Sequence, residues 1–178
     1  MKTLVYNKKD LMNVRKKNGF SLLELMVAVA IATVVIVGFY SAFITFDQMR
    51  IMNKNKLKAM NTARAKVEEM QSLGNVQDIF QSYNISQNLN FAVEGLNSRK
   101  DDEDGFVGAI VFPVGPDNTI WEDLDMPKLA MPMDLNMDGT LDESIDDFLT
   151  LPVLIEIKWR DASGTNSFAL LAYLRSTE

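Results

Sequence analysis

The chain has 178 residues, no cysteine and no histidine, and a formal net charge of −6. Without these two residue types it cannot form a disulfide, a Ser-His-Asp or Cys-His catalytic site, or a zinc site of the usual kind. The negative charge argues against nucleic acid as a general partner, and we expect no direct nucleic-acid binding.

The N-terminal quarter of the chain predicts a basic segment followed by a membrane-spanning helix. Residues 1–19 hold six bases against one acid, a net charge of +5, and residues 20–46 hold a single charged group, Glu24. At about 1.5 Å per residue, a helix over this apolar stretch reaches about 40 Å, more than the roughly 30 Å core of a bilayer. A cleavable secretory signal has only about 7–15 apolar residues before a small-residue site, and no Ala-x-Ala sequence follows here. We therefore predict a retained transmembrane helix.

Residues 47–73 predict an amphipathic continuation of that helix. Apolar residues recur there at steps of three or four, which is the spacing of one helix face, at Leu57, Met60, Ala63, Val67 and Met70. No proline interrupts residues 20–73, so we expect one helix of about 54 residues that stops at Gly74.

Residues 74–178 predict a small antiparallel β-sheet in an acidic domain, with 19 acids against six bases and a net charge of −13. Phe106 to Pro113 is a strand candidate, and Leu151 to Trp159 alternates as a half-buried strand does. Turn residues from Asp161 to Gly164 lead to a second apolar strand, Ser167 to Leu174, which predicts a C-terminal hairpin. The expected fold class is therefore α+β, with a long N-terminal helix packed on a β-rich globular domain.

The rest of this domain has weaker patterns. Residues 74–100 give no clear prediction, and residues 121–145 indicate a loop. We expect the acidic run Asp101 to Asp104 to be a solvated loop, and Trp121 and Trp159 to be core or interface anchors.

The junction Lys16-Lys-Asn-Gly-Phe-Ser-Leu-Leu-Glu-Leu-Met-Val-Ala28 holds a glycine, an aromatic residue and a lone acid at fixed spacing between a basic and an apolar segment. It resembles the class III signal of type IV pilins and of type II secretion pseudopilins. In that family a prepilin peptidase cuts after the glycine and methylates the new N-terminus. The resemblance implies cleavage after Gly19, methylation of Phe20, a cytoplasmic leader of residues 1–19, and a C-terminal domain outside the cytoplasm.

Glu24 is the single charge in the apolar stretch, and a charge inside a membrane normally has a partner. Cleavage before Phe20 would create a cationic amine in the same region. We expect Glu24 of one chain to pair with the Phe20 amine of a neighbour and to set the stagger between their helices. The resemblance implies the same role for Glu24 in an assembled fibre.

The resemblance extends more weakly into the globular domain. The segment from Ala63 to Leu73 and the closing hairpin are similar to those of minor pilins of the pilus-modification type. A minor type IV pilin that primes or enters a pilus fibre is the function implied, with no enzymatic activity. Its partners would be other pilin or pseudopilin subunits, the prepilin peptidase, an inner-membrane assembly platform and membrane lipid. Its location would be the bacterial inner membrane, as a single-pass protein, and then a pilus or pseudopilus.

Two alternatives stay open at this point. One is a minor pseudopilin of a type II secretion system, and the other, from a different class, is a membrane-anchored calcium-binding interaction module that never polymerises. The chain also departs from the family pattern in two ways. It cannot form the C-terminal disulfide loop of many major pilins, and its 19-residue leader is long, so that Met12 is an alternative start.

The loop Asp134-Leu-Asn-Met-Asp-Gly-Thr-Leu-Asp-Glu143 has the oxygen spacing of a calcium site. Oxygen side chains occupy positions 1, 3, 5 and 9 and a glycine occupies position 6, as in the first nine positions of an EF-hand loop. Position 12 is Ile145 rather than glutamate, so a nearby acid would have to replace it. The candidate calcium ligands are Asp134, Asn136, Asp138, Thr140 through its carbonyl, Asp142, Glu143 and Asp146. The alternative is a solvated acidic turn.

Overall fold

The computed structural model describes residues 19–85, 89–98, 105–161 and 164–176. The predicted leader up to residue 18 and the acidic run Asp101 to Asp104 lie outside these residues. The helical elements are α1 (Leu22–Gln71), α2 (Val76–Phe80), a π-helical turn η1 (Gln81–Ile85) and a 3-10 turn η2 (Pro127–Leu129). The strands are β1 (Asn90–Phe91), β2 (Gly108–Val111), β3 (Thr150–Asp161) and β4 (Gly164–Arg175).

The chain divides into two compact units, and the boundary between them falls within α1, after Thr45. The described part of the first unit is therefore residues 19–45, which include the apolar half of α1. The second unit, residues 46–178, holds the rest of α1 and every strand.

The long helix predicted from Phe20 to Leu73 is confirmed, with α1 covering 50 residues from Leu22 to Gln71. Gly74 follows the helix with a φ of 78°, a left-handed conformation that glycine adopts without a steric penalty. The amides of Leu73 and Gly74 donate to the carbonyls of Met70 and Gln71, which closes the last turn.

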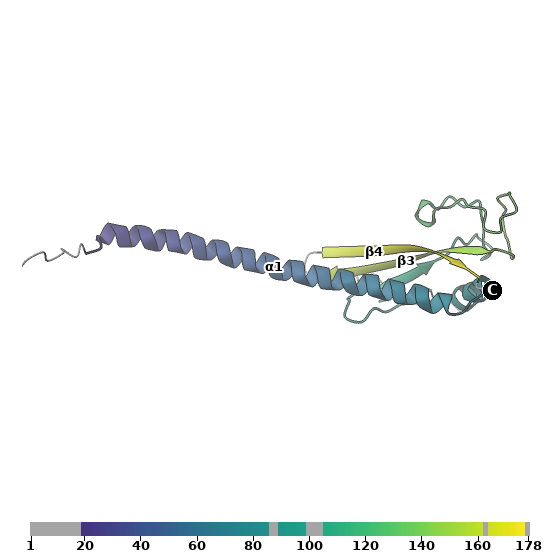
Figure 1. Ribbon diagram of the computed structural model, residues 1–178, viewed down its shortest axis with the longest axis horizontal. Coiled ribbons are helices and arrows are strands. Elements are labelled where there is room, and N and C mark those ends of the chain that lie inside the picture. The colour runs from purple at the N-terminus through teal and green to yellow at the C-terminus, as the bar shows by residue number, and fades with distance from the viewer. Residues whose placement is uncertain (1–18, 86–88, 99–104, 162–163, 177–178) are drawn as a thin grey trace, which may run out of the picture. The chain divides into compact units, whose positions relative to one another are not determined.

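The sheet has four antiparallel strands in the order β1-β2-β3-β4. The predicted hairpin is confirmed: β3 and β4 pair along their whole length, from Thr150 with Arg175 to Asp161 with Gly164 (Figure 1). The strand candidate from Phe106 to Pro113 is also confirmed, since β2 lies within it and pairs Gly108 with Ile157 of β3.

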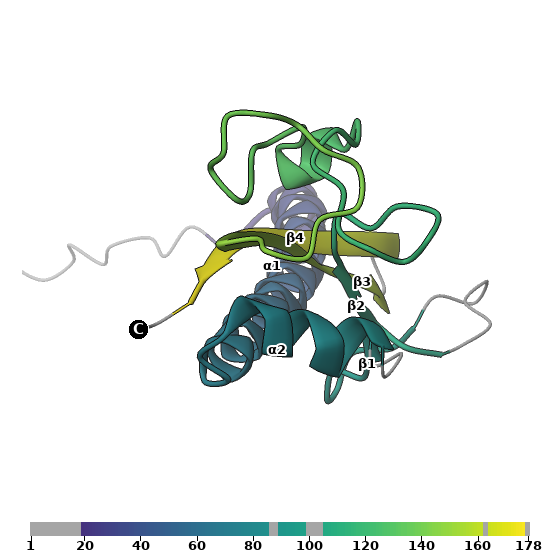
Figure 2. The same ribbon diagram turned by 90° about the vertical axis from the view of Figure 1, so that its right-hand side faces the viewer.

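The hydrophobic core of the second unit lies where α1 meets the sheet. The α1 residues Ala59, Ala63 and Met70 are completely buried, as are Ile155 and Ile157 of β3. Figure 2 shows α2 and the segment between β2 and β3 on opposite sides of β4, while Thr165, Ser167 and Ala169 of β4 stay exposed. The observed α+β architecture is the one predicted.

The segments without a clear pattern form short elements and loops. Asn75 caps α2, because its side-chain oxygen accepts a hydrogen bond from the Gln77 amide at 2.9 Å. Residues 121–145 contain η2 and otherwise no helix or long strand, as predicted. Trp159 is a core residue at 3% exposure, and Trp121 is half-buried.

Candidate functional site

The predicted cleavage junction stands at the start of α1. Gly19 and Phe20 precede the helix, and Glu24 lies in its first turn, where a negative charge interacts favourably with the helix dipole. A Cβ atom added to Gly19 would meet no other atom within 4 Å, so the fold does not require glycine at this position. The Phe20 side chain is 81% exposed.

In the apolar half of α1 the threonine and serine hydroxyls form hydrogen bonds within the helix. Thr33, Ser41 and Thr45 each donate to the backbone carbonyl four residues earlier, at 2.8–3.0 Å. Such bonds suit a helix in an apolar medium, which offers no other acceptors. The Glu24 carboxylate differs, since it forms no hydrogen bond or ion pair with any residue that the structure describes. Its partner must come from outside this part of the chain.

By length and composition, α1 is able to cross a membrane. The mean hydropathy of its apolar window is 2.6, and none of that window is buried within the chain. Bulky side chains such as Phe39 and Phe43 are each 74% exposed. This half of α1 therefore needs an apolar environment that its own chain does not supply.

The loop from Asp134 to Asp142 is closed by hydrogen bonds to its own side chains. The Asp134 carboxylate accepts from the amides of Met137 at 2.6 Å and Gly139 at 2.9 Å. Asp138 accepts from both the amide and the hydroxyl of Thr140, at 2.8 and 2.7 Å. The Thr140 hydroxyl bond is the main cause that lowers the pKa of Asp138. The acids at positions 1 and 5 are thus held within one turn.

A buried carboxylate, Glu122, which the sequence pattern did not predict as a functional residue, binds backbone amides of this loop. Glu122 is completely buried, and it accepts hydrogen bonds from the amides of Leu135 at 2.6 Å, Asn136 at 3.2 Å and Asp142 at 3.1 Å. Its backbone also pairs with the loop, through its amide and the Asp142 carbonyl. The sequence held one signal, because Glu122 stands at the inward position of an alternating stretch between Ile120 and Leu124.

The predicted calcium ligands are only partly brought together. Asn136, Asp138, Thr140 and Asp142 lie in one network, in which Asn136 donates to Asp138 and the Thr140 hydroxyl oxygen also lies 2.9 Å from an Asp142 carboxylate oxygen. Glu143 is exposed and makes no side-chain hydrogen bond to a described residue. Asp146 lines a separate cleft. Within the described part of the chain, no three acidic side chains are grouped so that they could hold a metal ion. Calcium binding stays a prediction.

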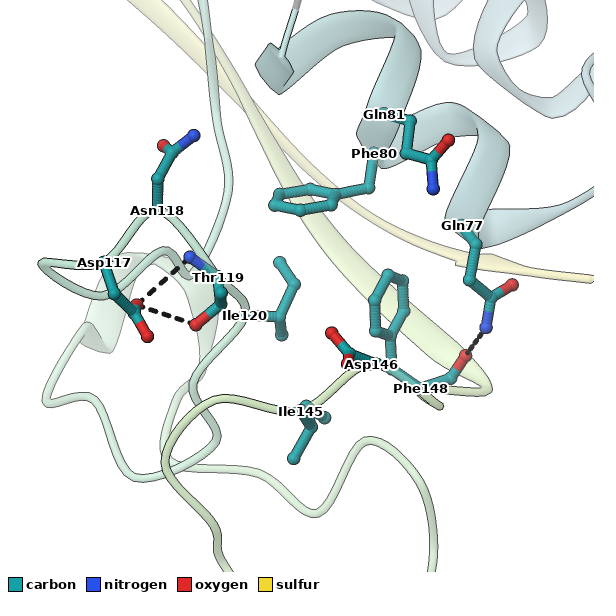
Figure 3. A pocket seen from close by; sticks show the side chains of 10 residues that line it. All are labelled: Gln77, Phe80, Gln81, Asp117, Asn118, Thr119, Ile120, Ile145, Asp146 and Phe148. Carbon is teal, nitrogen blue, oxygen red and sulfur yellow. Dashed lines mark hydrogen bonds between the residues drawn. The ribbon is translucent and has the colours of Figure 1, made fainter.

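Asp146 lines a cleft of about 470 Å³ at which three segments of the second unit meet. Figure 3 shows the lining side chains, which come from α2 and η1, from residues 117–120 and from residues 145–148. The rings of Phe80 and Phe148 meet edge to face at 5.9 Å between centroids. In Figure 3 the Asp146 carboxylate lies between Ile120 and Phe148. The cleft is therefore apolar in part and carries carboxylates.

Asp117 is the second carboxylate of this cleft. Its Oδ1 atom accepts hydrogen bonds from the hydroxyl of Thr119 at 2.7 Å and from the indole N–H of Trp121 at 2.9 Å. The Thr119 hydroxyl is the main cause that lowers the pKa of Asp117. This carboxylate is consequently ionised at neutral pH and fixed in its turn.

Comparison with known proteins bears on the N-terminal segment. Residues 14–40 match a family model described as the prokaryotic N-terminal methylation motif. Gly19, Phe20 and Glu24 all lie within the matched residues. Comparisons with curated proteins and with solved structures gave no match. The matched motif supports the family of type IV pilins and pseudopilins, whose members are structural rather than catalytic.

Proposed function

Because the N-terminal methylation motif supports a type IV pilin or pseudopilin precursor, we propose that this chain is a minor type IV pilin. Cleavage after Gly19 by a prepilin peptidase would give a mature chain that starts at a methylated Phe20. The observation that carries the proposal is the junction itself, where the methylation motif coincides with a glycine that the fold does not need and an exposed Phe20.

The carboxylate of Glu24 is the group that requires a second subunit. A charged side chain at mid-membrane costs about 2.5–3.5 kcal/mol on insertion scales, and less toward the helix end. The Phe20 amine of a neighbouring subunit would neutralise Glu24 and would gain an anionic partner itself. Pairing between subunits then fixes how far one helix is displaced along the next.

The exposed apolar half of α1 has two successive environments in this proposal. It first anchors the precursor in the bacterial inner membrane as a single span, with the C-terminal domain outside the cytoplasm. It then packs against the same segment of other subunits in the fibre, delivered by the inner-membrane assembly platform. Both environments bury side chains such as Phe39, which is 74% exposed in the single chain.

Co-expression with a prepilin peptidase tests the proposal. We expect intact-mass analysis to show loss of the segment ending at Gly19 and one added methyl group on Phe20. Gly19→Ala should block this cleavage. Gly38→Ala is the matched control, because a Cβ at Gly38 also meets open space, and it should be processed normally. An uncleaved Gly19→Ala protein that still functions would favour the membrane-anchored binding module instead.

A minor pseudopilin is the alternative within the same family. Both kinds of subunit share the processing step, so processing does not separate them. Deletion of the gene followed by parallel assays of surface fibres and of protein secretion does. Loss of fibres with intact secretion supports the pilin, and the reverse result supports the pseudopilin.

Calcium binding by the loop from Asp134 to Glu143 is a separate proposal. What supports it is the closed turn in which the Asp134, Asn136 and Asp138 side chains are held by backbone amides. A bound cation would stabilise the folded state by mass action, so millimolar calcium should raise the thermal midpoint. Asp138→Ala should abolish that increase. An unchanged midpoint in the wild-type chain would contradict the proposal.

A further inference from the structure

The cleft in Figure 3 has the lining that a lysine or arginine side chain requires. None of its ten lining residues is basic, and two of them, Asp117 and Asp146, are carboxylates. Asp146 is exposed and makes no side-chain hydrogen bond or ion pair with any residue that the structure describes. Phe80, which is half-buried, supplies apolar surface beside them, whereas Phe148 is only 3% exposed and closes the cleft from the core side. A long cationic side chain can cover such a surface with its stem while its charged end meets the carboxylates. We refer to it as the acidic cleft.

A surface of complementary character lies on α1 within the same unit. Arg50, Lys54 and Lys58 follow one another at intervals of four residues, so they lie on one face of the helix. Beside them Ile51 and Leu57 are 45% and 54% exposed. These five residues, together with Asn53, Asn61 and a single acid, Asp47, line a shallow depression of about 640 Å³, which we call the basic stripe.

The cationic side chains of the basic stripe form no ion pair with a described residue of the single chain. Lys58 donates to the backbone carbonyl of Glu94 at 3.2 Å. Among the described residues, Arg50 and Lys54 take part in no ion pair. No α1 residue lines the acidic cleft, and no residue beyond α1 lines the depression of the basic stripe. The two surfaces are thus separate and opposite in net charge. The exposed apolar area lies mainly on the basic stripe, at Ile51 and Leu57.

We propose that the basic stripe of one copy of this chain docks into the acidic cleft of a second copy. The proposal rests on the proposed function, since it names the surfaces by which neighbouring subunits meet. The contact joins two different patches, so the copy that supplies its basic stripe keeps a free acidic cleft, and the copy that supplies its cleft keeps a free stripe. A contact of this kind extends into a helical fibre when the rotation does not close a ring.

Site-specific cross-linking of the full chain in membranes tests this docking, because the natural sequence has no cysteine to interfere. One tagged copy carries Asn118→Cys in the acidic cleft, and a differently tagged copy carries Asn53→Cys in the basic stripe. We expect a cross-linked dimer that contains both tags. Met52→Cys is the matched control, since Met52 is exposed but does not line the depression, and it should give only background.

Charge reversal tests the chemistry of the contact. Lys54→Glu in the Asn53→Cys copy should lower the yield of cross-linked dimer about fivefold, the factor that corresponds to about 1 kcal/mol for an ion pair near a surface. Asp146→Lys in the Asn118→Cys copy should restore the yield. Asp147→Lys, in an exposed neighbour that does not line the cleft, should not restore it. Restoration cannot result from misfolding of either variant.

Three results would overturn the proposal. These are a yield no higher than the Met52→Cys background, a yield that Lys54→Glu leaves unchanged, and a cross-link only to a protein of another mass. A fourth arm measures binding of the chain to anionic vesicles: if Lys54→Glu weakens that binding and changes no cross-link, the basic stripe serves lipid instead. Cleavage after Gly19, measured in the same cells, reports on the proposed function separately. Processed chains without the cross-link reject only the docking.

Discussion

Residues 22–45 and residues 46–178 are both rich in apolar side chains, but they differ in what those side chains contact. Ile36 in the first region is 66% exposed, whereas Ile155 in the second has no exposed surface. Threonine and serine hydroxyls of the first region bond to their own helix, while the carboxylate of Glu122 in the second connects distant segments. The second region is complete as a folded domain, and the first is complete only with a membrane or other subunits around it.

The largest effect should come from truncating one isoleucine to alanine in each region, which removes three carbon atoms. Ile155→Ala should lower the free energy of unfolding of the second unit by about 3–4 kcal/mol, because it removes a buried side chain and leaves a cavity. Ile36→Ala should change it by less than about 0.5 kcal/mol, since the Ile36 side chain is 66% exposed and lies outside the core of that unit. Denaturant titration of the detergent-solubilised chain, followed by tryptophan fluorescence, measures both. Equal losses would contradict the comparison.

Glu122→Gln tests whether a carboxylate organises the second region. The amide group places an NH₂ donor against backbone N–H groups that now donate to oxygen, so we expect a loss of about 2–3 kcal/mol in the free energy of unfolding. Glu143→Gln is the control in the same loop region, and it should have almost no effect because Glu143 is exposed. A stability for Glu122→Gln equal to that of the control would show that the buried bonds contribute little.

Two glycines sharpen the comparison further. A Cβ at Gly115 would overlap the indole of Trp121, so Gly115→Ala should cost about 1–2 kcal/mol of unfolding free energy. Gly19→Ala meets open space and should leave that free energy unchanged while it blocks processing. Unfolding titrations and an electrophoretic assay of cleavage provide the two readouts. A cleavage defect in Gly115→Ala with normal stability would reverse the expected roles.

The smallest expected effect is a change in the free energy of unfolding with pH. A hydrogen bond from Lys128 at 2.7 Å, with a second from Lys158, lowers the pKa of Glu156 below its ordinary value of 4.5. A lowered pKa in the folded state stabilises the fold above the unfolded pKa, and this stabilisation is lost as the pH falls through the folded pKa. The free energy of unfolding should therefore decrease below about pH 4.5 by less than about 1 kcal/mol from this group. In Glu156→Gln that part of the pH dependence should vanish, and an unchanged pH profile would exclude the ion pair as its cause.

The elements that were predicted from sequence are those whose signals are local. Neighbouring residues alone are enough to predict the helical spacing of apolar residues in α1, the end of that helix at Gly74 and the apolar–polar alternation of β3. The same holds for the motif around Gly19. The buried role of Glu122 was missed, because its hydrogen-bond donors lie 13 to 20 residues away. The acidic cleft joins segments around residues 77, 117 and 146, and no local pattern indicates that these meet. For Asp146 the sequence predicted a calcium loop, whereas the fold places it in this cleft.

The central claim is that cleavage after Gly19 removes the leader and leaves residues 20–45 as the N-terminal helix through which subunits assemble. Intact-mass analysis of sheared surface fibres or of the pseudopilus fraction tests it most directly. We predict a chain of residues 20–178 that carries one methyl group on the Phe20 amine. A functional chain that retains the residues before Phe20, or a processed chain that is absent from every fibre fraction, would contradict it.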